Sequence, residues 1–401
     1  MTTEELRSCF PQLKRSVYGK PLVYLDNAAT SLRPQSVIDR WDEISANGTA
    51  NLHRAVHHIA AEATEAYENA RKVVGEYINS PETEEVIFTS GTTHAINLAA
   101  FSIGEAFIKE GDEIILGEGE HHSNIVPWQM MCRRKRASIR VLPVDENGRL
   151  QVEKLDALIS PRTRLVSVAH ISNVLGLVNP VKSIADICCK HRILLFVDGA
   201  QGVVHQKVDV QALGCDFYAF SGHKMYSAPG TGVLWGKREL LEEMPPMFGG
   251  GEMIETVKWE KSTWAPLPRK FEAGTQNISG TPCLIPAIEI IKEMPKDDDV
   301  KAYVYEELQK IDGLRLFGTS HDLSLKAPVF SFYVEHAHHE DLALILDKMG
   351  IALRSGQMCA EPLMDRYGVS GMLRASFAPY NTMQEAEYFL SSLCKAISML
   401  K

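Results

Sequence analysis

The sequence predicts an α/β protein with a mostly parallel sheet in a large domain and a smaller α+β domain. Three observations lead to this prediction. From Val86 onward, short β-branched and aromatic runs alternate with longer helical stretches. The short runs are apolar along their whole length, which is typical of strands buried on both faces. A charged stretch, KDDDV, then interrupts the alternation near Lys296, and a different order of elements follows it.

The expected elements follow in chain order. Six apolar runs are expected as strands of the large domain: EVIFTS, DEIILG, RLVSVAH, ILLFVDGA, CDFYAFS and TGVLWG. Between the first two, THAINLAAFSIGEAFIKEG has the length and pattern of a helix. After KDDDV we expect a helix at KAYVYEELQKI, a strand at APVFSFYV, a helix over 340–349 and a final amphipathic helix. The expected large domain spans residues 21–295, and the small domain combines residues 1–20 and 296–401.

Composition and charge exclude several classes of protein. Of the 401 residues, 45% are hydrophobic and 23% are charged, which supports a full core and excludes a disordered chain. The net charge is −9, so a nucleic-acid partner is not expected. The sequence has no run of about 18 apolar residues, no signal-peptide pattern in MTTEELRSCF and no CxxC pair among its eight cysteines. We therefore expect a cytoplasmic protein with reduced thiols and no membrane association.

Two of the expected strands end in residues that suit cofactor chemistry. RILLFVDGAQ contains Asp198, and DFYAFSGHK ends in Lys224. Ligands of α/β sheets bind at the carboxyl ends of the strands, and a buried lysine there is costly unless it is paired or covalently engaged. Each residue alone has an ordinary explanation, because Asp198 can cap a helix and Lys224 can reach the surface. Together they indicate pyridoxal phosphate (PLP), which needs a lysine and a carboxylate partner for its pyridine nitrogen.

A phosphate group also needs a binding site, and the segment SGTT is a candidate. Thr92 and Thr93 stand between the strand EVIFTS and the following helix. At such a position hydroxyl groups and the free amides of the helix N-terminus favour an anion. Ser221 and His223, beside Lys224, are candidates for further phosphate donors. The triplet GTT alone is weak evidence, because most such triplets are ordinary helix caps.

Histidines follow the strand DEIILG. His121, in EHHSN, is placed to stack its ring on a flat cofactor. A metal site would need further ligands at matched spacing, and the neighbouring sequence offers none. The group His336, His338 and His339 is interpreted as an exposed loop. We expect no metal site.

The segment RSGQMCAEP carries a cysteine. Gly356 and Pro362 indicate a turn or loop, so Cys359 is expected to be accessible. Most loop cysteines are nevertheless unreactive. Arg374, in LRASFAPYNT, has a guanidinium fork that suits a substrate carboxylate. A structural ion pair explains Arg374 equally well.

Ten motifs in register resemble one known family. They are, in order, VYLDNAAT, NLHR, SGTTHAINL, EHHSNIVPWQ, SNVLG, VDGAQ, DFYAFSGHK, FEAGTQN, LRSGQMCAEP and LRASFAPYNT. This order, from about residue 22 to 380, resembles the class V aminotransferase superfamily, and within it the Suf-type (group II) cysteine desulfurases and selenocysteine lyases. The resemblance implies the PLP-dependent transferase fold type I and a homodimer. It further implies L-cysteine as substrate, with L-selenocysteine as the near alternative, and a SufE-like or SufU-like persulfide acceptor.

The resemblance also implies a role for each matching residue. For the cofactor, the implied residues are Lys224 for the Schiff base, Asp198 for the pyridinium nitrogen, His121 for stacking and Gln201 for the phenolic oxygen. The implied phosphate ligands are Thr92, Thr93, Ser221, His223 and, from the second subunit, Thr275. For the substrate, the implied residues are Arg374 and Asn173 at the carboxylate and Cys359, with Arg354 close by, as the nucleophile that becomes a persulfide.

Two single residues and one segment depart from the family pattern, and three alternative functions stay open. Met358 stands where a histidine usually precedes the cysteine, residues 225–232 read MYSAPGTG, and Ser90 replaces an arginine. Because methionine cannot donate a hydrogen bond, we expect thiolate activation or acceptor docking to differ. The expected function is a cysteine desulfurase that supplies sulfur for iron–sulfur cluster assembly or a related transfer. The alternatives are a selenocysteine lyase, a kynureninase-like carbon-centred lyase and a non-catalytic sulfur-assembly scaffold.

Overall fold

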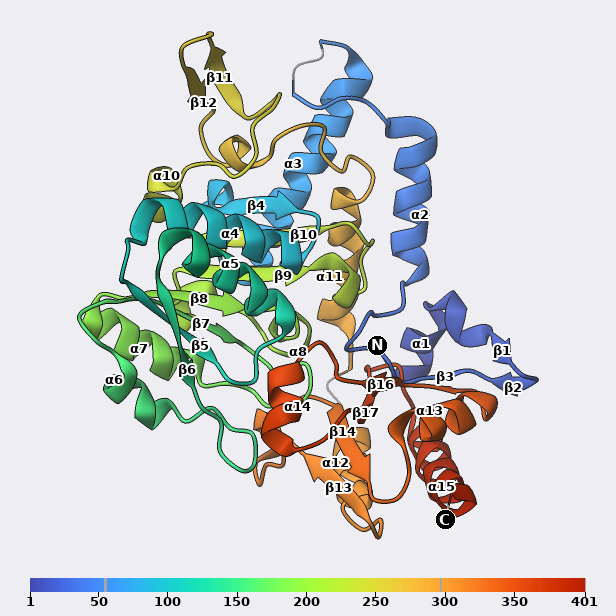
Figure 1. Ribbon diagram of the computed structural model, residues 1–401. Helices are drawn as coiled ribbons and strands as arrows, with labels where there is room; N and C mark the ends of the chain where they lie inside the picture. The colour runs from blue at the N-terminus through green and yellow to red at the C-terminus, as the bar shows by residue number, and fades with distance from the viewer. Residues whose placement is uncertain (54–55, 296–297, 401) are drawn as a thin grey trace.

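The computed structural model describes residues 1–53, 56–295 and 298–400 (Figure 1). Arg54 of the NLHR motif and residues 296–297 at the predicted domain boundary lie outside the described residues. In the described part, the chain forms a seven-stranded sheet, a four-stranded sheet and shorter strand pairs. The predicted α/β fold with a large, mostly parallel sheet is confirmed.

The large sheet has the strand order β4-β10-β9-β8-β7-β5-β6. Its strands are β4 (Val86–Thr89), β5 (Glu113–Gly117), β6 (Ser138–Leu142), β7 (Thr163–Ala169), β8 (Leu194–Asp198), β9 (Phe217–Ser221) and β10 (Gly232–Gly236). The pairs from β9 to β6 are parallel, and β10 runs antiparallel to both of its neighbours. The six predicted runs all form strands of this sheet. The sequence reading missed β6, because this edge strand is only partly buried and lacks a continuous apolar run.

Both faces of this sheet are buried, which explains the continuous apolar runs. In β8, Leu195 and Val197 belong to one hydrophobic core and Phe196 belongs to another. Successive side chains of a strand point to opposite faces, so a strand between two helical layers must be apolar throughout. The first core includes residues of α3 (His58–Ile78), α7 (Val181–His191) and α11 (Leu284–Glu293), and the second includes residues of α4 (Thr92–Phe107) and α5 (Val126–Lys135).

The remaining elements of this half of the chain are short or peripheral. They are α2 (Gln35–Glu43), α6 (Leu155–Leu158), α8 (Gly202–His205), α9 (Val210–Leu213) and α10 (Arg238–Glu243). The hairpin of β11 (Ile254–Val257) and β12 (Ser262–Trp264) projects from the body of the molecule (Figure 1). The sequence reading did not predict this hairpin, because its residues are largely exposed and show no buried pattern. Among the described helices, none has the length and apolar character to cross a membrane.

The C-terminal part forms a smaller α+β unit. Its antiparallel sheet has the order β13-β14-β17-β16, with β13 (Leu314–Phe317), β14 (Val329–Val334), β16 (Arg354–Gly356) and β17 (Met372–Ser376). Its helices are α12 (Asp299–Leu308), α13 (His339–Lys348), α14 (Glu361–Tyr367) and α15 (Met383–Leu400). Helix α14 was not predicted, since Pro362 suggested a loop. Proline is compatible with the first turn of a helix, where its missing N–H costs nothing.

The N-terminal segment joins the smaller unit. It contains α1 (Thr3–Ser8), β1 (Ser16–Val17), β2 (Lys20–Pro21) and β3 (Val23–Tyr24). Strand β3 pairs in parallel with β15 (Ile351–Ala352), and Val23 and Leu25 lie in the core of the C-terminal sheet. This pairing carries Asp26 and the residues after it to the junction of the two units. The predicted domain boundaries stay a prediction.

Candidate active site

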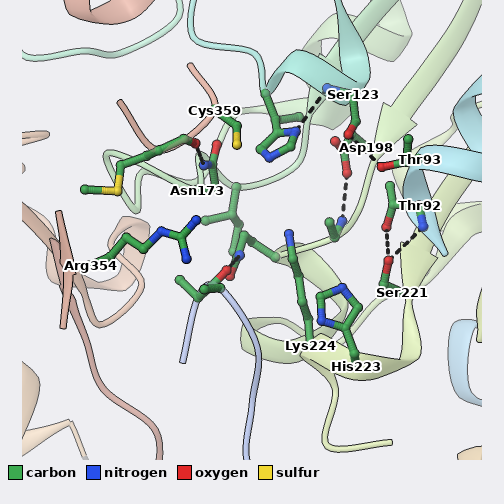
Figure 2. Close-up of a pocket in the computed structure, with 18 of the residues that line it drawn as sticks. Thr92, Thr93, Ser123, Asn173, Asp198, Ser221, His223, Lys224, Arg354 and Cys359 are labelled. Carbon is green, nitrogen blue, oxygen red and sulfur yellow. Dashed lines mark hydrogen bonds between the residues drawn. The ribbon is translucent and has the colours of Figure 1, made fainter. Parts of the chain in front are cut away.

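The carboxyl ends of the parallel strands meet at one cavity (Figure 2). The cavity has a volume of about 270 Å³ and is lined by Ala28, Ala29, Thr92, Thr93, His121, Ser123, Ala169, Ile171, Asn173, Asp198, Ala200, Gln201, Ser221, His223, Lys224, Arg354, Met358, Cys359 and Arg374. Most of these residues follow strands of the large sheet. The last four belong to the smaller unit, so the cavity lies where the two units meet.

Lys224 and Asp198 enter this cavity from the ends of β9 and β8 (Figure 2). Burial lowers the pKa of Lys224, against the negative charge of Asp198, and the positive charge of Arg374 lowers it further. Burial raises the pKa of Asp198, against the charge of Lys224 and a hydrogen bond of 2.9 Å from the Ala200 N–H. A lysine with a lowered pKa holds a larger fraction of neutral amine. That form is the one that attacks a carbonyl or takes a proton.

His121 lines the same cavity with a neutral ring. Burial lowers its pKa to about 3, and the positive charges of Lys224 and Arg374 act in the same direction. Its Nδ1 accepts a hydrogen bond of 3.0 Å from the Ser123 N–H. Because Nδ1 is the acceptor, we assign the ring proton to Nε2. A neutral imidazole in this position can stack on a flat, electron-poor ring.

A group of hydroxyls surrounds the N-terminus of α4 (Figure 2). The Thr92 N–H donates to Ser221 Oγ over 2.7 Å, and the hydroxyls of these two residues also lie 2.7 Å apart. The hydroxyls of Thr93 and Ser123 lie 2.7 Å apart as well. Gly91 precedes the helix with φ +150°, a conformation that L side chains rarely adopt. Hydroxyls and free helix amides together form a cradle for an anion such as a phosphate.

Two further side chains extend this wall of the cavity. Burial lowers the pKa of His223 to about 4, and its Nδ1 lies 3.2 Å from Thr30 Oγ1. Gln201 is buried, and its Nε2 donates to the Ala28 carbonyl over 2.8 Å. Both contacts tie the strand ends to the VYLDNAAT segment.

Two arginines face each other on neighbouring strands of the smaller sheet. Arg354 in β16 is the cross-strand partner of Arg374 in β17. The Asp26 carboxylate lies 3.3 Å from Arg374 Nη2 and 3.9 Å from Arg354 Nη1. Arg374 Nη1 donates to the Asn173 carbonyl over 2.9 Å, whereas its buried Nε has no hydrogen-bond partner among the described residues. Because two guanidinium groups share one carboxylate, the site keeps a positive charge that suits a second, substrate carboxylate.

Cys359 sits on a tight turn between β16 and α14. The Ala360 N–H donates to the Gln357 carbonyl over 3.0 Å, which closes a four-residue turn. Its two central residues, Met358 and Cys359, have φ values of 54° and 55°. Positive φ at both central positions is the pattern of turns that favour glycine, asparagine and aspartate. Cys359 is exposed, as predicted for an accessible thiol.

Twelve of the thirteen predicted site residues line this cavity, and Thr275 does not. Their roles stay predictions, and the structure adds detail for some of them. Asn173, predicted at the substrate carboxylate, donates its Nδ2 to the Met358 carbonyl over 2.8 Å. Met358, which occupies the position where the family pattern has a histidine, is buried in the apolar core of the large unit.

The sequence reading missed several residues at this site. Ser123 of the motif EHHSN was not predicted as a site residue, although its hydroxyl lies 2.7 Å from that of Thr93. Asp26 lies in VYLDNAAT, and only the fold brings it between the two arginines. His122 contacts the Cys359 turn through its backbone and its ring. Such contacts leave no pattern in a single sequence.

The interpretation of His336, His338 and His339 as an exposed loop is wrong for His339, which is buried and is the first residue of α13, whereas His336 and His338 are exposed. His338 Nδ1 accepts from the Glu340 N–H over 3.3 Å at the start of α13. His339 Nδ1 lies 2.7 Å from Ser355 Oγ. In residues 1–53, 56–295 and 298–400, no group of three or more His, Cys, Asp or Glu side chains is arranged to hold a metal ion.

Comparison with known protein families matches residues 23–389 to Aminotransferase class-V. This chain belongs to the class V aminotransferase family. Its predicted membership is therefore confirmed. A "Probable cysteine desulfurase" of Xylella fastidiosa (strain 9a5c) is 45% identical to this chain, over 99% of this chain and 96% of its own length. A "Cysteine desulfurase" of Salmonella agona (strain SL483) is 44% identical, over 99% and 98%.

Two solved structures of cysteine desulfurases share the whole fold. The cysteine desulfurase CsdA from Escherichia coli has a TM-score of 0.92 at 36% identity, covering 100% of both chains. The apo cysteine desulfurase from Thermococcus onnurineus NA1 has a TM-score of 0.94 at 33% identity, covering 100% of this chain and 99% of its own. The predicted PLP-dependent fold type I therefore matches these structures.

Proposed function

We propose that this chain is a PLP-dependent cysteine desulfurase that converts L-cysteine to L-alanine and holds the sulfur as a persulfide on Cys359. The observation that carries the proposal is that Cys359 lines the same cavity as Lys224 and the arginine pair. A thiol, an amine and a carboxylate-binding site are thereby available to one small amino acid. Full-length relatives named cysteine desulfurase, at 44–45% identity, support the same activity. We propose iron–sulfur cluster assembly as the process that receives the sulfur.

The residues of the cavity fit PLP. The cradle of Thr92, Thr93, Ser123 and Ser221 at the α4 N-terminus offers hydroxyl and amide donors to a phosphate. The neutral His121 ring is available for stacking, and Asp198 and Lys224 would hold the pyridine nitrogen and the aldehyde carbon. When bound, PLP supplies an electron sink for the carbon atom that loses a proton.

The protein's own residues would position the substrate and move its proton. We assign the substrate carboxylate to the arginine pair, where the buried Arg374 Nε has no partner among the described residues. This places the amino group and Cα toward Lys224. Because its pKa is lowered, Lys224 can act as a neutral base that takes the Cα proton and later returns it.

The sulfur step then belongs to Cys359. Its thiolate attacks the sulfur of L-cysteine, so that a sulfur–sulfur bond forms while the carbon–sulfur bond breaks. The electron pair of the broken bond stays on the carbon fragment, which takes up protons and leaves as L-alanine. The sum is Cys359–SH plus L-cysteine giving Cys359–SSH plus L-alanine, and it needs no external oxidant or reductant.

The decisive experiment compares wild type with Cys359→Ala. Alanine and sulfide release from L-cysteine are measured with dithiothreitol present, and L-selenocysteine is tested in parallel. We expect Cys359→Ala to keep the visible absorbance of bound PLP and to lose at least about 100-fold in turnover of L-cysteine. The exposed Cys394 in α15 provides the matched control, Cys394→Ala. Equal alanine release by wild type and Cys359→Ala would remove Cys359 as nucleophile and favour the lyase alternatives, and turnover of L-selenocysteine alone would identify a selenocysteine lyase.

We also propose a homodimer in which Thr275 completes the phosphate site of the partner. Thr275 is exposed and lies outside the cavity of its own chain. The segment before it is firmly anchored, because Glu272 pairs with the buried Arg71 at 2.6 Å and accepts from the Phe88 N–H at 2.7 Å. An anchored segment that holds an exposed threonine outside the cavity of its own chain suits a subunit interface.

The nearby hairpin supports this interface. Val257 and Trp259 are 65% and 103% exposed, and exposed apolar groups of this size are typical of protein contacts. We expect a dimer in sedimentation velocity, and about tenfold weaker PLP binding in Thr275→Ala from the loss of one hydrogen bond. The control is Thr319→Ala, a threonine that contacts Asn147. A monomer with unchanged PLP affinity would contradict the proposal.

The finer assignments stay predictions from the sequence. They are the Suf-type subgroup, a SufE-like or SufU-like acceptor and a cytoplasmic location. Stimulation of L-cysteine turnover by an added acceptor protein of the SufE or SufU type is the measurement that tests the first two.

A further inference from the structure

We propose that His122 is a positioning residue for the Cys359 nucleophile, which it holds in place by fixing the turn of residues 357–360. The inference rests on the proposed function, in which Cys359 attacks the substrate sulfur. His122 does not line the cavity, whereas its neighbour His121 does. His122 therefore acts through the turn and not by contact with the substrate.

The turn needs support from outside its own residues. Met358 and Cys359 are not glycine, yet both have φ near +55°. In this left-handed region the Cβ atom crowds the following carbonyl, so neither residue prefers the conformation. Such a strained backbone conformation persists where contacts from the surrounding structure hold it in place. At this turn, hydrogen bonds from the large unit provide those contacts.

Three contacts from the large unit reach the turn and the start of α14. Asn173 Nδ2 donates to the Met358 carbonyl over 2.8 Å (Figure 2). The His122 N–H donates to the Cys359 carbonyl over 2.7 Å, and the Glu361 N–H donates to His122 Nε2 over 3.0 Å. His122 thus binds the Cys359 carbonyl through its backbone N–H and the N–H of Glu361, the first residue of α14, through its ring. Its ring caps one of the free amides at the start of α14.

The side chain can be tested with two matched substitutions. In His122→Gln, the side-chain oxygen occupies roughly the place of Nε2 and can still accept from the Glu361 N–H. In His122→Asn, the oxygen occupies the place of Nδ1 and is too short to reach this amide. Neither residue can act as a general acid or base near neutral pH. The control is His191→Asn, since His191 ends α7 away from the turn and its Nε2 contacts Asp156 of α6.

Turnover of L-cysteine, PLP absorbance and amide hydrogen exchange are measured for all three variants. We expect His122→Asn to lower kcat about tenfold, the effect of one lost hydrogen bond, with KM and absorbance unchanged. Amide exchange in residues 357–361 should become faster in His122→Asn and stay as in wild type in His122→Gln. His122→Gln should keep kcat within about twofold of wild type, as should His191→Asn.

Several results would overturn the inference. One is a His122→Asn variant with wild-type kcat and exchange. Another is a His122→Gln variant with intact absorbance but tenfold lower kcat, because the hydrogen bond alone would then not suffice; this result counts even if His122→Asn does not fold. Cys359→Ala is measured in the same assay. If it loses activity, the proposed function stands whatever His122 does, and if it keeps full activity, the proposed function fails and the inference with it.

Discussion

The two sides of the cavity are built in different ways. On the side proposed for PLP, Asp198 and Ser221 end strands β8 and β9, whose backbones are paired with their neighbours in the large sheet. On the side proposed for sulfur, Cys359 lies on a turn with two positive φ values. The first side is fixed by the sheet to which it belongs. The second is fixed by hydrogen bonds from a different unit of the molecule.

Magnitudes show why the second side needs those bonds. A left-handed conformation costs about 1–2 kcal/mol for a residue with a side chain, so the turn carries about 2–4 kcal/mol. A hydrogen bond contributes about 1 kcal/mol net, so the three contacts to Met358, Cys359 and Glu361 supply about 3 kcal/mol. The two values are of similar size. The free energy that the contacts from the large unit supply is therefore about equal to the backbone strain energy that they oppose.

Replacement of Lys224 should have the largest effect, and it should abolish the function of the PLP side without changing the Cys359 turn. In Lys224→Ala, the amine that would hold PLP and move the Cα proton is lost. We expect loss of the PLP absorbance band and at least about a 1,000-fold fall in turnover. The control is Lys237→Ala, a lysine that pairs with Asp216 away from the cavity. An unchanged visible spectrum would contradict the assignment of Lys224.

Replacement of Asp26 should act on the charge between the two sides. Asp26→Asn keeps an oxygen beside Arg374 but removes the negative charge that competes with a substrate carboxylate. We expect KM for L-cysteine to fall about fivefold with little change in kcat, because the charge attraction for the substrate increases. The matched variant is Asp39→Asn in α2, where the side chain contacts Gln35. A higher KM would show that the main role of Asp26 is to orient the guanidinium groups of Arg354 and Arg374.

A smaller, pH-dependent effect should come from His170 on the PLP side. Its backbone N–H donates to the Asp198 carbonyl over 2.8 Å, and burial lowers the pKa of its side chain to about 4. The unfolded chain takes up this proton near pH 6.5. Between about pH 6.5 and 4 the unfolded state therefore binds more protons, and the free energy of unfolding falls as the pH falls.

In His170→Gln this contribution disappears. We expect the slope of unfolding free energy against pH to drop by about 1 kcal/mol per pH unit between pH 4.5 and 6.5, measured by urea unfolding. His191→Gln, at the exposed end of α7, serves as the comparison. A wild-type slope in His170→Gln would show that other groups carry the acid sensitivity.

The sequence predicted the parts of the fold that depend on burial. Strands β8 and β9 were recognisable because both faces are covered and the residues before the polar strand ends are hydrophobic. Strand β6 and the β11–β12 hairpin were missed, since exposed residues carry no such constraint. Helix α14 was missed because Pro362 is compatible with both a loop and a helix start.

The site divides in the same way. Lys224, Asp198 and Cys359 could be found from strand ends and motifs, because their side chains carry the chemistry. The contacts of His122 and Asn173 with the Cys359 turn could not be found, since the acceptors are backbone carbonyls that every residue possesses. Asp26 was missed for a related reason, because its partners lie more than 300 positions away in the chain.

The hydrogen bonds from the large unit to the turn have a consequence for a molecule in which the two units have partly separated. If the two units separate, the bonds from His122 and Asn173 break together, and Met358 and Cys359 are released from a backbone conformation that neither prefers. The PLP side keeps its strand pairing in the same event. In a damaged or partly folded molecule, Cys359 would thus lose its position before the cofactor site loses its structure. Sulfur would then no longer be transferred to this thiol, because it no longer faces the pocket.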